Sequence, residues 1–535
     1  MVDLTVILNY NKSMERHLPI GIQDFVKIRE GGYNYVDKSA QIHRLINSSG
    51  SAFFLSRPRR FGKSLLCSTL EAIFEGKRKL FTNLAIHSLD WEWKKYPVIL
   101  IDLNPGNYSN GVNELYVNLN RDLELCAKKY DVPFSGETVS DRFVRLIYTL
   151  HERCNERVVV IIDEYDKPLI NTIENSDLHV SVRNELKGFY GVLKSSDKYL
   201  KFVFLTGVTK FSQVSVFSDL NHLIDLTLDV RYADICGITQ EELESNFESE
   251  INKILEDTGK NRAGYMERLR SFYNGYRFSK KTLSVYNPFG LLNHFDKGGD
   301  FFPYWYQTGT PAFLVKLVVS QKINIINLNN LRVGYNDFAK YDIEKIRAVP
   351  LLYQCGYLTI ADYNEELNHF ILDYPNEEVR SCFAKSLLEQ YTQVSAGISD
   401  NLYSQLLFAL FTGDIACAID NLQIFFSSIP YDIIKETENY YQTAVHLIFT
   451  MIGLDCRSEV RISSGRIDTL VETKNYVYCF EFKLNKTVEE ALKQIDKRNY
   501  LLPWKNSGKK LFKVGVNFDH EKRNIGEWQA EEAFC

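Results

Sequence analysis

The sequence predicts an α/β multidomain protein with a parallel sheet in its first half, and three observations support this fold class. Short apolar runs alternate with helical patterns through the first 235 residues, as expected for strands that are buried on both faces. Helical patterns then dominate the middle of the chain, and a segment that mixes strands with helices ends it. We therefore expect three regions, at residues 15–235, 236–425 and 426–535.

The parallel sheet is expected from five runs of β-branched, aromatic and other apolar residues. They lie at 52–56, 97–103, 158–162, 201–206 and 222–228. Helical patterns separate the runs, so crossover connections would place the strands in parallel and leave helices on both faces of the sheet.

Each of the two later regions has its own pattern. In the middle region, a helix through 351–355 precedes strand-like runs at 357–362 and 369–375. This order predicts either a winged-helix-like unit or a hairpin attached to a helical domain. The last region should contain helices at about 436–452 and 487–500, and strands at about 458–462, 466–472, 476–483 and 511–518.

The composition is that of a globular chain, because 45% of the 535 residues are hydrophobic and 24% are charged. No apolar stretch approaches the ~18 residues of a membrane span, and the N-terminus lacks the pattern of a signal peptide. The ten cysteines form no CxxC pair, which favours a reducing cytoplasm. The net charge of −5 provides no general attraction to nucleic acid.

A strand, a loop and a helix follow one another at 52–74, and Gly62, Lys63 and Ser64 open the helix. Glycine lets the backbone approach a phosphate, and free amides at a helix start point at anionic oxygens. Lys63 would contact the β- and γ-phosphates, and Ser64 would bind Mg²⁺. Arg57 stands where the GxxxxGK[ST] pattern has its first glycine, and a chance GKS at a helix start is the alternative.

Nucleotide contacts are expected along this whole loop. Arg59 and Arg60 either add positive charge beside a triphosphate or point outward. No guanine-specific N/TKxD motif occurs near the end of the sheet, so ATP is favoured over GTP. The candidate cofactor-binding residues are Arg59, Arg60, Phe61, Gly62, Lys63, Ser64 and Leu65.

Two adjacent acids end the apolar run at 158–162. Asp163 would hold Mg²⁺ through water, and Glu164 would polarise the attacking water as a base. Asp166 stands before a Lys-Pro pair and is interpreted as a helix cap rather than a ligand. An acidic strand end together with the loop at 57–62 predicts a site for ATP and Mg²⁺.

A second group of polar residues lies in the last region. Glu481 and Lys483 alternate along one strand and so share one face of it. A short connection folds the preceding strand back, which brings Asp468 level with Glu481 to within one residue of register. Metal-dependent phosphodiester cleavage needs acidic oxygens on a divalent ion and a cation near the phosphate. Gln494 on the following helix would orient water or phosphate, and Lys497 and Arg498 give the polar side of that helix a basic edge. An exposed strand face with no chemistry is the alternative.

The runs RPRRFGKSLL, IIDEYDKPL, FLTGVTKFS…FSDLNHLIDLT, DVRYADICGIT, FYNGYRFS and YWYQTGTPAFL resemble the bacterial AAA-ATPase-like family, whose members carry a C-terminal PD-(D/E)XK nuclease-like domain. The resemblance covers the chain from about residue 17 onward. It implies an additional-strand (ASCE-type) P-loop core and a restriction-endonuclease-like last domain. Arginine in place of the first loop glycine is typical of this family.

The resemblance also suggests roles for further residues. Thr206 would be a polar γ-phosphate sensor at the end of the fourth strand, and Lys210 is a weaker candidate. Arg231 would neutralise transition-state charge, unless it forms a surface salt bridge. The last region resembles the GRxD…ExK…Q pattern of PD-(D/E)XK nucleases, in which Asp468 and Glu481 bind metal and Asp468, Glu481, Lys483 and Gln494 are catalytic. Glu438 and Glu459 are possible extra carboxylates.

Two functional hypotheses follow. In the first, ATP binding and hydrolysis control a metal-dependent nuclease that acts on DNA or RNA. In the second, the chain is a nucleotide-dependent switch or scaffold whose nuclease-like domain is inactive. An ATPase that only binds ATP is a third possibility. Both main hypotheses exclude a membrane partner and leave the oligomeric state open.

Overall fold

The computed structural model describes residues 17–210, 222–280, 283–308, 312–335, 338, 347–394, 396–434, 437–462 and 465–533. The N-terminal expectation, that no signal peptide is present, lies outside these residues, as do the start of the first region and the parts of the quoted motifs at 211–221 and 309–311. The chain divides into two compact units, Met1–Trp305 with Arg332–Pro375, and Tyr306–Leu331 with Asn376–Cys535. Both units contain parts of the expected middle region, so the three-part division stays a prediction.

The first unit is built on a five-stranded parallel sheet in the order β2-β3-β4-β1-β5. This sheet confirms the fold class and the five strand positions. The strands are β1 (Ala52–Ser56), β2 (Val98–Asp102), β3 (Val158–Asp163), β4 (Leu200–Gly207) and β5 (Ile224–Asp225). β5 is shorter than expected because the chain leaves the ladder at Thr227, whose hydroxyl accepts a hydrogen bond from the Ser56 amide.

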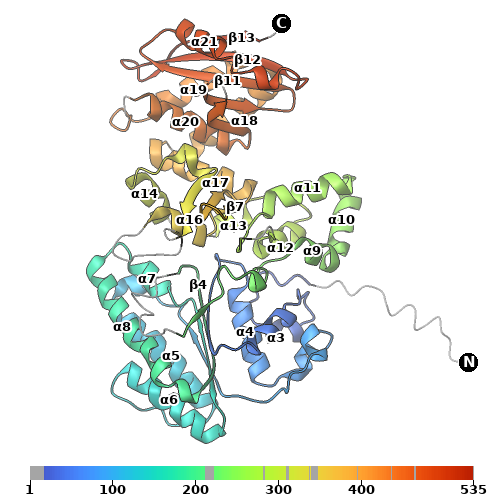
Figure 1. Ribbon diagram of the computed structural model, residues 1–535, viewed down its shortest axis with the longest axis vertical. Coiled ribbons are helices and arrows are strands. Elements are labelled where there is room, and N and C mark those ends of the chain that lie inside the picture. Colours follow the sequence, from blue (N-terminus) through green and yellow to red (C-terminus); the bar gives the residue numbers. More distant parts are fainter. Residues whose placement is uncertain are drawn as a thin grey trace, which may run out of the picture. The chain divides into compact units, whose positions relative to one another are not determined.

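Helices cover both faces of this sheet, with α3 and α4 on one side and α5, α6 and α8 on the other (Figure 1). Every residue of β1 and β3 is buried, which explains their continuous apolar sequences. The helices are α2 (Phe25–Glu30), α3 (Ser39–Ile46), α4 (Lys63–Phe74), α5 (Val112–Lys129), α6 (Val139–Cys154), α7 (Lys167–Thr172) and α8 (Ser176–Ser195).

The middle of the chain is mainly helical. It includes α9 (Gln240–Asn246), α10 (Glu248–Thr258), α11 (Arg262–Tyr273), α12 (Pro288–Asp296), α13 (Tyr304–Gln307), α14 (Ala312–Ser320), α16 (Ala348–Gln354), α17 (Glu377–Thr392), α18 (Ala396–Thr412) and α19 (Ile415–Ser427). The helix-and-hairpin pattern gives α16 followed by antiparallel β7 (Thr359–Asn364) and β8 (His369–Asp373). A strand that we did not expect, β6 (Leu331–Gly334), pairs with β8 and completes a three-stranded sheet.

The C-terminal part of the second unit is a mixed five-stranded sheet in the order β13-β12-β11-β10-β9. β11 and β12 run parallel, and the other neighbours are antiparallel. The elements are α20 (Glu438–Met451), β9 (Asp455–Ile462), β10 (Gly465–Glu472), β11 (Tyr476–Leu484), α21 (Val488–Lys497), β12 (Lys510–Asp519) and β13 (Asn524–Glu532).

The two faces of β11 pack against different helices. Cys479 belongs to a core with Leu492 and Ile495 of α21, whereas Phe480 lies 5.3 Å from Phe449 of α20, centroid to centroid. Strand alternation therefore places Glu481 on the α21 face. Within the described ranges, no helix combines the length and apolarity needed to cross a membrane.

Candidate functional site

The loop between β1 and α4 is the first candidate site. Gly62 has φ 91° and forms the N-cap of α4, so Lys63 is the first helical residue. A side chain at position 62 would be strained by this backbone conformation even though its surroundings are open. The loop thus presents the first amides of a twelve-residue helix, which have no partners within the helix, beside a lysine.

Lys63 is buried against acidic residues at the end of β3. Its Nζ lies 3.2 Å from Glu164 Oε1 and donates to Pro58 O at 3.2 Å. Burial alone would lower the pKa of Lys63, but Glu164, Asp163 and Asp166 raise it above its ordinary value. Lys63 is therefore a charged ammonium at the start of α4, paired with Glu164.

Asp163 and Ser64 form the oxygen-rich part of this site. The Ser64 side chain hydrogen-bonds to the Asp163 carboxylate, while burial, followed by the charge of Glu164, raises the pKa of Asp163 to about 7. A hydroxyl and a carboxylate in contact are hard oxygen donors of the kind that Mg²⁺ prefers. The residues present therefore fit a magnesium ion, and a cation would also favour the ionised form of Asp163.

Arg57, which stands in place of the first glycine of the usual loop pattern, contacts backbone carbonyls of the fold. Its side chain is fully buried. The guanidinium donates to Ser56 O, Thr227 O and Tyr232 O at 2.8, 3.0 and 2.9 Å, and it lies 4.2 Å from the centroid of the Phe278 ring. The arginine thus holds the end of β5 to the loop, a role that the sequence pattern did not indicate.

The other residues expected in the first site are placed as follows. Thr206 is buried and donates to Leu55 O at 2.9 Å. Arg60 is exposed, with its guanidinium 4.8 Å from the Phe289 ring centroid, and the Arg59 carbonyl accepts a hydrogen bond from the Trp305 indole. Arg231 follows β5 and pairs with Asp229 at 2.6 Å, the surface arrangement that we had weighed as its alternative.

Asp166 begins α7 without a side-chain cap bond. Its buried carboxylate instead accepts hydrogen bonds from the amides of Val208 and Thr209 and from the Thr209 hydroxyl. Burial, followed by the charge of Glu164, raises its pKa to about 6. Asp166 therefore fixes the segment that follows β4. In the sheet, β4 lies between β3 and β1.

The second candidate site lies on β10 and β11. Thr469 pairs with Phe480, and continuing that register places Asp468 opposite Glu481. Asp468 Oδ2 accepts a hydrogen bond from the Phe482 amide at 3.0 Å, and Lys483 Nζ lies 2.7 Å from Glu481 Oε1. The backbone pairing thus brings together the acid, acid and lysine that the sequence placed on two strands.

Burial dominates the electrostatics of this second site. It raises the pKa of Glu481 to about 7, with a further contribution from Asp468 and against the effect of Lys483. Burial also raises the pKa of Asp468. Glu481 Oε2 is buried and has no hydrogen-bond partner, so a cation would satisfy it.

Asp468 and Glu481 can provide two carboxylate ligands to a divalent cation. Across the described ranges, no three His, Cys, Asp or Glu side chains are grouped closely enough to form a metal cluster. Glu438, which we listed as an extra carboxylate, lines the same cavity, whereas Glu459 pairs with Arg466 at 3.2 Å.

The cavity over these carboxylates measures about 650 Å³ and has an acidic floor and a basic rim. Gln494 lines it and donates to the Tyr500 hydroxyl at 3.4 Å. Besides Lys483, five cations share the lining and form its rim: Arg466, Lys486, Lys493, Lys497 and Arg498. We had noted only Lys497 and Arg498. The i, i+4 spacing of Lys493 and Lys497 was a usable signal, because it places both on one helix face.

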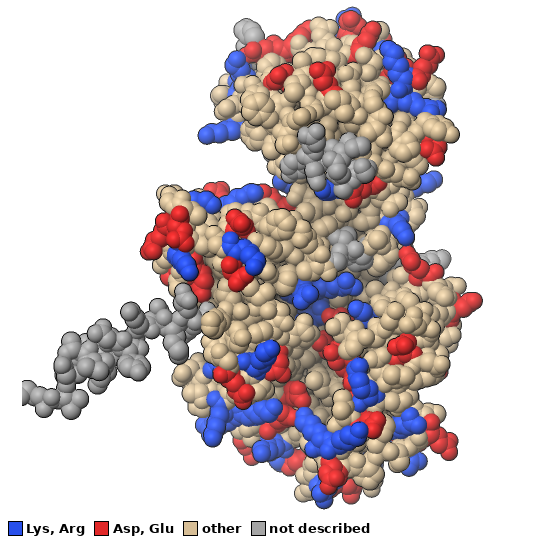
Figure 2. All heavy atoms as spheres, turned by 180° about the vertical axis from the view of Figure 1, so that it is seen from behind, with Lys and Arg blue, Asp and Glu red and all other residues tan. Residues whose placement is uncertain are grey.

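This rim is a local feature. Figure 2 shows Lys and Arg interspersed with Asp and Glu over most of the face that it presents. That distribution agrees with the net charge of −5. Any attraction of this chain for a polyanion therefore depends on cations grouped around a site rather than on overall charge.

Comparisons with known proteins match the parts of the chain that contain the two candidate sites. A family model described as "Predicted AAA-ATPase" matches residues 19–217, and a model of the PD-(D/E)XK nuclease superfamily matches residues 436–528. A protein of Azotobacter chroococcum mcd 1, described as "Uncharacterized protein in vnfD 5′region", is 34% identical over 521 residues, which cover 95% of this chain and 98% of that protein. The chain therefore belongs to the family of AAA-ATPase-like proteins with a C-terminal domain of the PD-(D/E)XK nuclease superfamily.

Proposed function

We propose that the chain binds and hydrolyses ATP with Mg²⁺ at the end of β1 and β3, and that this activity controls a metal-dependent nuclease at β10 and β11. One observation carries the proposal. A buried lysine at the start of α4 lies 3.2 Å from the carboxylate that follows β3, beside a Ser64–Asp163 hydrogen bond. We also propose the domain boundaries 15–235, 236–425 and 426–535, and a cytoplasmic location.

In the ATPase site, each residue has a distinct task. The loop amides and Lys63 bind the phosphates, because a charge-assisted contact to a phosphate is stronger than a neutral hydrogen bond. Ser64 and Asp163 hold Mg²⁺, which neutralises charge on the phosphate oxygens. Glu164 orients and deprotonates the attacking water. It is free to do so once the nucleotide phosphates replace it as the partner of Lys63.

In the nuclease-like site, Asp468 and Glu481 hold a divalent cation, which activates water and stabilises the phosphate charge. Lys483 is placed on the same strand face as Glu481 and contacts the scissile phosphate. Gln494 orients the water or phosphate. The five rim cations hold the adjoining phosphates of DNA or RNA, a contact made by Lys and Arg side chains in nucleic-acid complexes.

The alternative function is a nucleotide-dependent switch whose nuclease-like domain binds a partner without cleaving it. Two contacts favour this alternative: Asp468 Oδ2 already accepts from the Phe482 amide, and Glu481 Oε1 already contacts Lys483. A calorimetric titration with Mn²⁺ separates the two functions. Binding that is lost in Asp468→Ala supports the nuclease, and equal binding to the wild-type chain and Asp468→Ala supports the switch.

The decisive experiment measures cleavage of labelled DNA and RNA with Mg²⁺ or Mn²⁺, with and without ATP. We expect wild-type cleavage to depend on ATP, Asp468→Ala to abolish it, and Lys63→Ala to remove the effect of ATP. Asp496→Ala is the matched control, because Asp496 lies on α21 and pairs with Lys513 rather than lining the cavity. Equal inactivity of the wild-type chain and Asp468→Ala on all substrates would contradict the nuclease assignment.

A further inference from the structure

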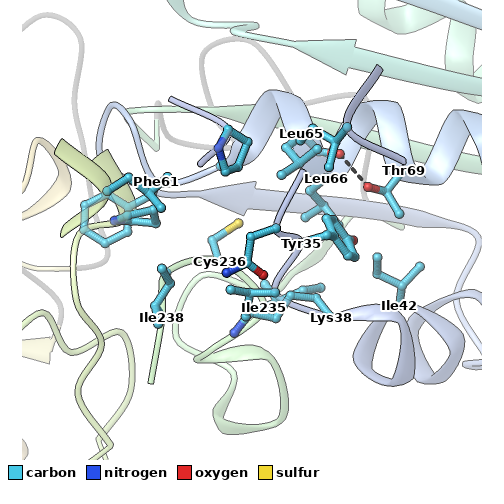
Figure 3. A pocket seen from close by; sticks show the side chains of 18 of the residues that line it. Tyr35, Lys38, Ile42, Phe61, Leu65, Leu66, Thr69, Ile235, Cys236 and Ile238 are labelled. Atoms are coloured by element: carbon cyan, nitrogen blue, oxygen red, sulfur yellow. Dashed lines mark hydrogen bonds between the residues drawn. The ribbon is translucent and has the colours of Figure 1, made fainter. Parts of the chain in front are cut away.

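The two candidate sites differ in how a neighbouring helix uses its polar side chains. Beside the phosphate-binding loop, Phe61, Leu65 and Ile235 help to line an apolar pocket of about 100 Å³ (Figure 3). Thr69 lines the same pocket, and its hydroxyl donates to Leu65 O within α4 itself. At the second site, by contrast, a side chain of α20 donates to the backbone of a proposed metal ligand. Only the second kind of contact can position a residue of another element.

Helix α20 presents a row of three polar side chains to the C-terminal sheet. Glu438, Gln442 and His446 follow one another at four-residue intervals, so they lie along one face of the helix. Glu438 lines the cavity of the second site. Gln442 Nε2 donates a buried hydrogen bond of 3.0 Å to the backbone carbonyl of Asp468. The row therefore reaches from the cavity to the backbone of a residue that we expect to bind metal.

Asp468 lies at an irregular point of the sheet. The register of β9 and β10 places Glu459 opposite Asp468, since Thr469 pairs with Ser458. Glu459 has φ 53°, a left-handed conformation rather than that of a strand. On the other side of β10, the regular pairing with β11 starts at Thr469. Strand pairing alone therefore does not fix the backbone of Asp468.

Two hydrogen bonds hold Asp468 at this irregular point. Its carbonyl accepts from Gln442, and its Oδ2 accepts from the Phe482 amide at 3.0 Å. One bond fixes the backbone and the other fixes the carboxylate, so both ends of the residue are restrained. Asp468 lines the cavity, and we expect its other oxygen, Oδ1, to meet the cation. Removal of the Gln442 bond would release the backbone end and leave both carboxylates of the site in the chain.

Helix α20 has further attachments that do not involve the Gln442 amide. Every residue from 440 to 451 is buried. His446 Nδ1 lies 2.8 Å from Ser458 Oγ on β9, and Phe449 packs against β11. A substitution that removes only the amide of Gln442 should therefore leave the helix on the sheet and the C-terminal part folded.

We propose that Gln442 is a positioning residue of the nuclease-like site, and that its amide holds the backbone of Asp468 where the Asp468 carboxylate can bind the metal ion. This inference rests on the proposed nuclease function. Gln442 is not among the described residues that line the cavity, so it acts through Asp468 and not on the metal or the substrate. Loss of a partner that orients a metal ligand typically lowers metal affinity about 10–100-fold.

The first test measures the Mn²⁺ affinity of the full chain by calorimetry, for the binding that Asp468→Ala removes. Gln442→Met deletes the amide and keeps an unbranched side chain of similar length. We expect Mn²⁺ affinity to fall roughly tenfold, whereas affinity for labelled DNA and RNA without metal should stay the same, because the rim cations make that contact. An unchanged Mn²⁺ affinity would overturn the inference. An equal loss of both affinities would also overturn it, because it would show a general loss of structure.

Cleavage assays then separate a positioning residue from a metal ligand. Gln442→Met should regain wild-type cleavage when Mn²⁺ is raised about tenfold, since both carboxylates are still present. Asp468→Ala should not regain it at any Mn²⁺ concentration. If Gln442→Met stays inactive at saturating Mn²⁺, Gln442 does more than position the ligand and the inference fails.

Thr443→Val is the matched control for a lost hydrogen bond. Thr443 is the next residue of α20, is also buried, and donates to Asn439 O within the helix. Its replacement removes a buried hydrogen bond without a change at Asp468, so Mn²⁺ affinity should stay at the wild-type value. A similar loss of affinity in Thr443→Val would assign the effect to the helix and contradict the inference.

A second variant decides the question if Gln442→Met does not fold. Gln442→Asn keeps a buried amide but shortens the side chain by one methylene, so it should also lose Mn²⁺ affinity, and wild-type affinity in this variant would overturn the inference. Equal Mn²⁺ binding by the wild-type chain and Asp468→Ala has a different meaning, because it would remove the nuclease proposal and the inference with it.

Discussion

Both candidate sites place a buried lysine against a carboxylate, but they assemble this pair in different ways. In the first unit, Lys63 and Glu164 come from separate elements, and the parallel sheet brings them within 3.2 Å. In the C-terminal sheet, Glu481 and Lys483 are two residues apart on one strand, with 2.7 Å between their charged atoms. The second pair follows from strand alternation alone, whereas the first requires the order of the strands.

The sites also differ in how they would hold phosphate. The first relies on backbone amides at the start of α4, one lysine and an adjoining apolar pocket. The second has side-chain cations around an open cavity of about 650 Å³. An enclosed site with fixed donors suits one small ligand, whereas a rim of mobile cations suits a polymer whose phosphates continue past the site. The following predictions test this contrast.

The largest effect is expected for Glu164→Gln. Loss of the general base should lower ATP turnover about 10²–10⁴-fold, while nucleotide binding is kept because Lys63 loses a competing carboxylate. Phosphate release and calorimetry measure the two quantities. Glu152→Gln, at an exposed position of α6, is the control. Normal turnover in Glu164→Gln would show that another group acts as the base.

Arg57→Met tests whether the arginine supports the fold or the nucleotide. The change leaves buried carbonyls such as Thr227 O and Tyr232 O without their donor, so the free energy of unfolding should fall by about 2 kcal/mol. Affinity for ATP should change little, because the guanidinium contacts backbone carbonyls and the Phe278 ring. Urea denaturation and calorimetry provide the two measurements. A loss of ATP affinity with unchanged stability would assign Arg57 to the phosphate site.

Cation binding at the C-terminal site should strengthen as pH rises towards 7. The pKa of Glu481 is raised to about 7, first by burial, and a cation binds the ionised carboxylate. Affinity for Mn²⁺ should therefore rise about tenfold per pH unit below 7 and level off above it.

Without metal, the raised pKa of Glu481 should make the fold less stable as pH rises. The folded chain retains a proton that the unfolded chain releases near its ordinary pKa of 4.5, so the free energy of unfolding should fall as pH rises from about 4.5 to 7. Glu481→Gln isolates this site from Asp163, whose pKa is also raised to about 7. A pH dependence that persists unchanged in Glu481→Gln would assign it to the ATPase site.

The smallest effect is expected for a single rim cation. Lys493→Gln should weaken nucleic-acid binding a few-fold, and it should reduce the slope of log affinity against log salt by about one. Fluorescence anisotropy over a salt series measures both. Lys522→Gln, next to Asp519 and outside the cavity, is the control. If Lys522→Gln has the same effect, the rim is not the binding surface.

Local patterns account for much of what could be predicted. β1, β3 and β4 of the first sheet were visible as continuous apolar runs because almost all of their residues are buried. β13 was missed, since its exposed and polar residues alternate without a strong pattern and it forms only by pairing with β12. The carboxylates and lysine of the second site were predicted, but most of the cation rim was not, because it combines residues from β10, α21 and the loop between β11 and α21.

The sequence by itself determined the elements whose pattern is complete within a few residues: the strand, loop and helix around Lys63, the acidic end of β3, and the alternation of Glu481 with Lys483. Only the tertiary structure decided that Arg57 bonds to Thr227 and Tyr232, and that Lys63 lies 3.2 Å from Glu164. The physical reason is the distance along the chain. A contact between residues far apart in sequence depends on strand order and packing, and neither is encoded in any one segment.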